Sequence, residues 1–124
     1  GLAPYVMNLA TAEHALGEWA SAITHYEEAA RLAGRLGREA TRAAALTNLA
    51  GLYATIGASS EARTVLAQAE ASAAASGAAI YRAQARLISA EVAGIENKEQ
   101  GRALARSWAR ACRRRGPGGD VRHQ

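Results

Sequence analysis

The chain has 124 residues, of which 49% are hydrophobic, and its formal net charge is +4. This length supports one domain with a modest core, and the hydrophobic share excludes a chain that is disordered throughout. The sequence has no uninterrupted apolar run of about 18 residues and no secretory signal, which argues against a membrane span and against export. The lone Cys112 cannot form an internal disulfide, so we expect a cytoplasmic location. Since the chain starts at Gly1 without an initiator Met, we also expect it to be part of a longer protein.

The positive charge is concentrated at one end of the chain. Residues 1–97 carry seven basic and nine acidic side chains, whereas residues 98–124 carry eight basic and two acidic ones. All the excess positive charge therefore belongs to the last helix and the tail that follows it.

Apolar residues recur at steps of three and four along the chain, and strand signals are absent, so the sequence predicts an all-α fold. Six helices are expected in three pairs, at residues 4–16 and 18–36, 38–56 and 59–76, and 79–95 and 98–114. Gly37, Gly77 and Gly116 end the pairs, as glycine does in left-handed C-caps. Ser59 or Ser60 is expected to be an N-cap, and the third pair is expected to break at residues 96–97. Residues 116–124 are expected to form a flexible tail.

The chain repeats itself with a period of 40 residues. When residues 8–37 are laid over residues 48–77, nine positions keep the same residue. They are Asn8/Asn48, Leu9/Leu49, Ala10/Ala50, Gly17/Gly57, Ala22/Ala62, Thr24/Thr64, Ala29/Ala69, Ala33/Ala73 and Gly37/Gly77. A third, weaker copy fits with a shift of 39, through Gly101, Ala105 and Trp108. A fixed period in this range indicates a solenoid, in which each unit buries its apolar face against its neighbours.

The pattern inside each unit resembles the tetratricopeptide repeat (TPR). The second unit has an Asn48-Leu49-Ala50 step, an aromatic at Tyr53, a turn glycine at Gly57, a small residue at Ala62 and an apolar residue at Leu66. The resemblance implies a right-handed superhelix of three antiparallel helix hairpins, with units at residues 4–37, 38–77 and 78–116. The period exceeds the usual 34 residues, and this longer form is similar to the repeats of MalT-type bacterial regulators.

The same resemblance implies a ligand surface on the first helix of each pair. Carried over residue by residue, it comprises Asn8, Thr11, His14, Thr47, Asn48, Gly51, Arg86 and Ala90. Asn8 and Asn48 match the position whose amide bonds the ligand backbone in peptide-binding members. The alternative is that each Asn caps or bridges neighbouring helices.

A basic stripe is the second candidate site. Its members are Arg102, Arg106, Arg110, Arg113 and Arg114, which recur about once per helical turn. Such a row could bind phosphates or an acidic protein surface, or it could simply be a solvated outer face.

No catalytic constellation, cofactor motif or metal-ligand spacing is present, so we expect neither an enzyme nor a cofactor or metal site. The sequence favours a module that binds proteins or peptides, including other domains of its parent chain, within a larger bacterial regulator. Two alternatives stay open: a nucleic-acid-associated module that uses the arginine-rich helix, and a structural spacer or self-association segment. A homo-oligomer is among the partners considered.

Overall fold

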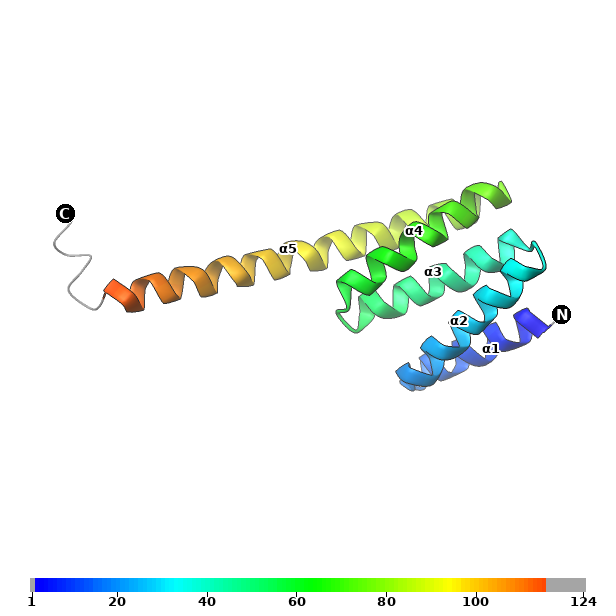
Figure 1. The fold of residues 1–124 in the computed structure, drawn as a ribbon, viewed down its shortest axis with the longest axis horizontal. Helices are drawn as coiled ribbons and strands as arrows, with labels where there is room; N and C mark the ends of the chain where they lie inside the picture. The colour runs from blue at the N-terminus through cyan, green and yellow to red at the C-terminus, as the bar shows by residue number, and fades with distance from the viewer. Residues whose placement is uncertain (1, 116–124) are drawn as a thin grey trace.

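The structure is a computed structural model that describes residues 2–115. These residues form five α-helices and no strand. The helices are α1 (Leu2–Ala15), α2 (Trp19–Arg35), α3 (Glu39–Thr55), α4 (Ser59–Ser76) and α5 (Ala79–Arg115) (Figure 1). The predicted all-α class is therefore confirmed, and the predicted positions of the first four helices agree with the structure to within two residues at each end.

The helices form an open array rather than a closed bundle. Each helix packs against its neighbours in the chain, α3 also contacts α1 and α5, and α2 makes no contact with α4. Figure 1 shows the hairpins α1–α2 and α3–α4 side by side, with α5 laid along the second hairpin and extending well beyond it. This is the arrangement of successive hairpins that the 40-residue period predicts.

The same turn joins the helices three times at 20-residue intervals. Gly17, Gly37 and Gly57 all have positive φ, at 79°, 68° and 79°. In the third turn Gly57 N–H donates to the carbonyl of Ala54 at 3.1 Å, and Ala58 N–H donates to that of Tyr53 at 2.8 Å. This bonding pairs the last free carbonyls of the helix, and the left-handed backbone it needs strains any residue with a Cβ. The glycine spacing therefore sets the repeat.

The core is made mostly of alanine, with a few large side chains at the contacts between units. Ala22 and Ala62, the predicted small crossing residues, are fully buried. Tyr26 is 1% exposed and packs with Leu49 and Leu52 of the next hairpin. Large side chains of one unit thus fill the contact with the next.

The predicted helix count of six is wrong, because α5 runs unbroken through residues 96–97. Two side chains on this stretch bind α4. Arg63 donates from Nη2 to Glu96 Oε1 at 2.7 Å, and Ser59 Oγ donates to Glu99 Oε1 at 2.7 Å. Each of the four turns between helices has a glycine with positive φ, whereas Asn97 is helical. Without a turn glycine, and with both glutamates bound to α4, the backbone continues as helix.

The expectation that Ser59 or Ser60 is an N-cap is also wrong. The N-cap of α4 is Ala58, which has no side-chain capping bond, and both serines lie inside the helix. Ser59 is 9% exposed, and its hydroxyl is used by Glu99 of α5. The predicted tail at 116–124 and the predicted stop at Gly116 lie outside the described residues.

Candidate functional site

A groove with a cavity volume of about 330 Å³ lies between α1, α3 and α5. We call it the α1–α3–α5 groove. Residues of α3 at steps of three and four form its floor, α5 forms one wall, and a single histidine comes from α1. The residues used below are His14, Thr47, Asn48, Gly51, Leu87 and Glu91.

Helix α3 presents two polar side chains to this groove that have no partner within the described residues. Asn48 is exposed and makes no hydrogen bond to any residue of 2–115. Thr47 is 4% exposed, and its Oγ1 is buried without a hydrogen-bond partner there. A buried hydroxyl that lacks a partner loses its hydration without compensation. In this fold, then, Asn48 neither caps nor bridges helices, and its exposed amide is available to a ligand, whereas the Thr47 hydroxyl is buried in the floor of the groove.

Gly51 brings α5 close to the floor of the groove. A Cβ at this position would lie 3.3 Å from Ile88 Cδ1, a tighter approach than side chains ordinarily make. The glycine therefore allows α5 to approach α3, which places Leu87 and Glu91 opposite Asn48 across the groove.

Four of the eight predicted surface residues line this groove, namely His14, Thr47, Asn48 and Gly51. The other four lie elsewhere. Asn8 and Thr11 are exposed on α1 outside the lining, and Ala90 is exposed on α5. Arg86 lies in a separate hollow of about 270 Å³ between α4 and α5, with Glu70 and Arg82. Since α5 is one continuous helix that lies along both α3 and α4, its residues are divided between two surfaces.

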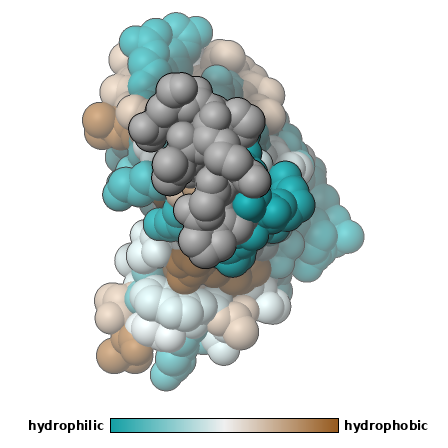
Figure 2. All heavy atoms as spheres, turned by 90° about the vertical axis from the view of Figure 1, so that its left-hand side faces the viewer, coloured by the Kyte–Doolittle hydropathy of each residue, from teal (hydrophilic) through white to brown (hydrophobic). Residues whose placement is uncertain are grey.

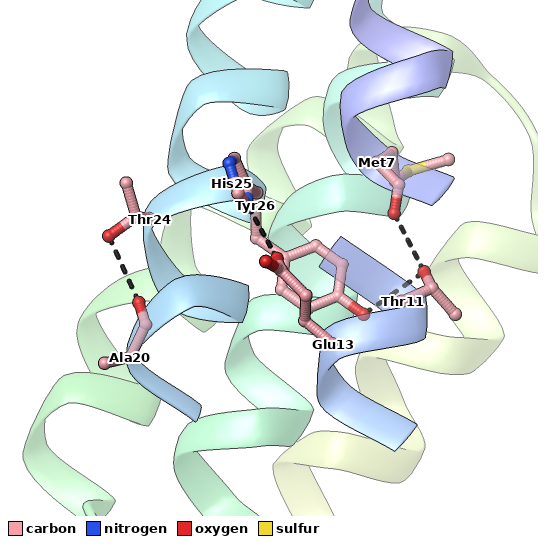
Figure 3. A network of polar contacts seen from close by, with 7 residues as sticks. All are labelled: Met7, Thr11, Glu13, Ala20, Thr24, His25 and Tyr26. Atoms are coloured by element: carbon pink, nitrogen blue, oxygen red, sulfur yellow. Dashed lines mark hydrogen bonds and ion pairs between the residues drawn. The ribbon is translucent and has the colours of Figure 1, made fainter. Parts of the chain in front are cut away.

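A polar network beside the groove holds α1 to α2, and the sequence did not reveal it. Tyr26 Oη donates to Thr11 Oγ1 at 3.3 Å and lies 3.3 Å from His14 Nδ1. Nearby, Glu13 pairs with His25 (Figure 3). Both pairs cross the hairpin: Glu13 and His25 are twelve residues apart in sequence, and so are His14 and Tyr26. In an antiparallel hairpin the sequence separation of facing residues grows with distance from the turn, and Thr11 and Tyr26 are accordingly 15 residues apart. The turn glycine Gly17 is therefore the signal from which these contacts could have been predicted. His25 is half-buried by its pairing with Glu13.

A larger hollow, of about 610 Å³, lies on the other side of α3. It opens because α2 and α4 do not touch, and its floor includes Leu46, Leu49 and Tyr53. Burial and the nearby carboxylates of Glu27 and Glu61 raise the pKa of Tyr53. We call it the α2–α4 hollow. The repeat pattern does not point to it, because the family resemblance assigns ligands only to the first helix of each pair.

The five predicted basic-stripe residues, at positions 102, 106, 110, 113 and 114, are all exposed on α5. None of them makes a hydrogen bond or ion pair within residues 2–115. They lie beyond Glu99, the last residue of α5 whose side chain is bonded to α4. The stripe is therefore a free cationic surface on the projecting half of the helix.

Neither surface has the chemistry of a reaction centre. Among residues 2–115 no three His, Cys, Asp or Glu side chains come together as a metal-ligand group. Cys112 is a half-buried free thiol on α5. No helix of residues 2–115 is both long and apolar enough to cross a membrane. What the α1–α3–α5 groove offers is hydrogen-bonding groups beside apolar walls, an arrangement suited to binding.

Comparison with known proteins agrees with this geometry. The family model of the tetratricopeptide repeat matches residues 2–75, the two regular hairpins. No curated protein and no solved structure matches the chain. Repeats of this kind are in general protein-interaction modules and non-catalytic scaffolds. With more than half of its length matched and with this architecture, the chain belongs to the tetratricopeptide repeat family.

Proposed function

We propose that the domain binds a segment of a partner protein in the α1–α3–α5 groove. The observation that supports this most directly is the exposed Asn48 amide on α3, which lines the groove and has no hydrogen-bond partner within residues 2–115. An amide both donates and accepts, so Asn48 can hold the backbone of a peptide without dictating its sequence. Leu87 and Ile88 supply the apolar wall against which a side chain of that peptide packs.

The charge of the groove favours a ligand that is not acidic. Glu91 is the one acidic residue among the lining residues, which include no Lys or Arg, and Arg86 lies in a different hollow. A groove without Lys or Arg cannot form ion pairs with a C-terminal carboxylate. We therefore propose a neutral or basic segment that is bound through its backbone and one apolar side chain.

A random-peptide phage library panned against the 124-residue chain tests this proposal. Selected peptides should lose about tenfold in affinity for Asn48→Ala, because one or two hydrogen bonds to the ligand disappear. Gln68→Ala is the matched control, since Gln68 is an exposed amide that lines the α2–α4 hollow instead. If the selected peptides respond to Gln68→Ala and not to Asn48→Ala, the binding surface is the α2–α4 hollow.

Thr47→Val separates binding from folding. The Thr47 hydroxyl is buried and unpaired, so replacing it with a methyl group of the same shape should leave stability unchanged or raise it. The same change should leave peptide affinity unchanged, because the buried hydroxyl does not reach the ligand, whereas Asn48→Ala should lower it. A loss of affinity for Thr47→Val would contradict the assignment of peptide binding to the exposed Asn48 amide.

A second candidate function is binding of nucleic acid by the basic stripe. The observation in its favour is that the five arginines project on α5 without partners within residues 2–115. Binding of a 20-base-pair DNA probe, followed by fluorescence anisotropy, should weaken steeply with salt and disappear in Arg106→Glu/Arg110→Glu. Asn48→Ala should have no effect on the same assay.

We also propose that the domain is the sensor or adaptor part of a larger bacterial regulator in the cytoplasm. The long repeat period, similar to that of MalT-type regulators, supports this, as does a chain with one free cysteine. Co-purification of the intact parent protein with its partners tests the proposal directly.

A further inference from the structure

Helix α5 has an apolar seam along the side that faces away from α3 and α4. Its members recur in alternating steps of three and four, the repeat of a two-stranded coiled coil. The seam consists of Ile80, Ala83, Leu87, Ala90, Gly94, Asn97, Gly101, Leu104, Trp108 and Ala111. It covers about four and a half heptads, or about 46 Å of helix, which is long enough for a stable pair.

This seam is uncovered in the fold. Nine of its ten residues are exposed and Ala111 is half-buried, with Leu87 at 71%, Leu104 at 68% and Trp108 at 65%. A Cβ added at Gly94 or Gly101 would meet nothing within 4 Å, so the middle of the seam is open as well. Figure 2 views the molecule from the end where α5 finishes and shows apolar surface beside hydrophilic surface there. A row of exposed large apolar residues at this spacing indicates a docking surface.

The opposite side of α5 shows which face is already used. Ala85, Val92 and Glu99 follow one another at steps of seven, and they pack against or bond to α3 and α4. The next two positions in this row are Arg106 and Arg113, which are exposed. The seam and the basic stripe thus lie on opposite sides of the helix, and the body of the domain leaves the seam exposed, with Leu87 at the edge of the α1–α3–α5 groove.

We propose that the seam pairs with the α5 seam of a second copy of this chain, in antiparallel orientation. Side-chain sizes complement one another when the helices are centred between residues 95 and 96. Trp108 then faces Ala83, Leu104 faces Leu87, and Ile80 faces Ala111. The small residues Ala90, Gly94, Asn97 and Gly101 meet at the centre, where two helices can approach closely.

Charge selects the same orientation. In this register Glu91 of each copy flanks the seam opposite Lys98 of the other, which gives two ion pairs related by the two-fold axis. Residues 98–115 carry seven basic side chains and one acidic, whereas residues 79–97 carry two of each. A parallel pair would place the two cationic halves together, and the antiparallel pair places each beside a neutral half. In this pair, helices α1–α4 of each copy lie on the side of α5 that faces away from the other copy, and the two sets of helices lie at opposite ends of the paired α5 helices.

The pairing also explains how the second half of α5 remains helical. Beyond Glu99 the helix leaves the α3–α4 hairpin, and isolated helices of this length are marginal in water. The same register could be formed within one chain only if α5 broke near residues 96–97. The bonds from Arg63 to Glu96 and from Ser59 to Glu99 oppose that break.

Analytical ultracentrifugation of the 124-residue chain tests the proposal by measuring the molecular mass of the species in solution. A dimer is expected, and Leu104→Asp should weaken it more than a hundredfold, since two copies of the Leu87–Leu104 contact are lost. Arg106→Ala, on the opposite side of the helix, is the control and should leave the mass unchanged. A chain that stays monomeric up to about 200 µM would overturn the proposal.

Charge reversal tests the register. Glu91→Lys and Lys98→Glu should each weaken the dimer about tenfold, because two attractive pairs become repulsive, and the double variant should restore it. A dimer that ignores all three changes would refute antiparallel pairing at this register.

Cross-linking separates two copies from one. With Cys112→Ser as the background, Ala90→Cys/Gly101→Cys should form a covalent dimer on oxidation. Ala90→Cys alone should not, because the two thiols introduced at position 90 would lie about 16 Å apart. If the double-cysteine variant instead closes within a single chain, α5 folds back as a hairpin and the proposal fails.

Discussion

Shortening Leu66, the one leucine of α4, should strongly destabilise the fold. Its side chain is fully buried where α3, α4 and α5 meet, against Ala50 and Ala85, with Val65 and Ile88 at the edge. Leu66→Ala removes apolar groups from this contact and leaves a cavity. Measured losses for such changes are about 2.7–5 kcal/mol, depending on how far the surroundings collapse.

The surroundings of Leu66 are poorly suited to collapse. Ala50 and Ala85 have no side chain beyond Cβ that could move into the space, and both belong to helices fixed by other contacts. We therefore expect a loss of about 3–4 kcal/mol in the free energy of unfolding. For a domain of this size the total is roughly 6–17 kcal/mol, so the variant should remain folded at room temperature.

Urea unfolding followed by far-ultraviolet circular dichroism measures this loss. With a slope of about 1–3 kcal/mol per molar urea, the midpoint should fall by about 1–4 M. Leu16→Ala is the control, since Leu16 is 74% exposed and its truncation should cost under about 0.5 kcal/mol. Equal losses in the two variants, or a loss below about 1 kcal/mol for Leu66→Ala, would refute the packing of α5 on the second hairpin.

Three further predictions concern the turns and the titratable groups. Gly57→Ala should destabilise the fold by about 1–2 kcal/mol through backbone strain alone, because φ is +79° and an added Cβ would meet no atom within 4 Å. Gly34→Ala, inside α2, should instead stabilise the fold by about 1 kcal/mol, because alanine favours helix over glycine. Urea unfolding measures both changes. The hydrogen bond from Arg63 lowers the pKa of Glu96 in the folded protein. The Glu96 carboxylate therefore stabilises the fold at pH values above its pKa in the unfolded chain, and this stabilisation is lost as pH falls through its pKa in the folded protein. The stability difference between wild type and Glu96→Gln should accordingly shrink below about pH 4 and be constant near neutrality. The pKa of Tyr53 is raised in the folded protein, so the neutral phenol stabilises the fold below about pH 10, and this stabilisation should be lost as pH rises through the pKa of Tyr53 in the folded protein. Thermal melts at alkaline pH should show that Tyr53→Phe removes this loss.

The first two hairpins could be predicted from sequence because their information is local and repeated. Glycines at 17, 37 and 57 supply the left-handed turns, and the small and large residues such as Ala22 and Tyr26 recur at the helix contacts. Each unit meets only its neighbours, so a pattern that is correct for one unit is correct for the next.

The third unit could not be predicted in the same way, because repeat spacing and turn chemistry point to different structures there. Its residues match the repeat with a shift of 39, but residues 96–97 contain no glycine. The deciding contacts, Arg63 with Glu96 and Ser59 with Glu99, join residues 33 and 40 positions apart. Polar contacts of this range leave no periodic trace in a single sequence.

The ligand surface was half predictable for a related reason. The resemblance selected one face of α1 and α3, and His14, Thr47, Asn48 and Gly51 do gather in one groove. The resemblance assigns Arg86 and Ala90 to the same ligand surface, which requires that residues 79–95 form the first helix of a normal hairpin. Since α5 contacts both α3 and α4, Arg86 is turned towards α4 and Ala90 is directed outward.

The two proposed surfaces share residues, so they should not act independently. Leu87 belongs to the seam and Glu91 flanks it, and both also line the α1–α3–α5 groove. In an antiparallel pair, Leu87 is covered by Leu104 of the second copy and Glu91 is paired with Lys98. A peptide that needs either residue must then displace part of the second copy, and by linkage each event weakens the other by the same factor. Peptide affinity should therefore be higher for Leu104→Asp, which cannot pair, than for the wild-type chain at concentrations where it is dimeric. If peptide affinity is the same for both, the groove is reached without Leu87 and Glu91, and the ligand is held by the α3 floor alone.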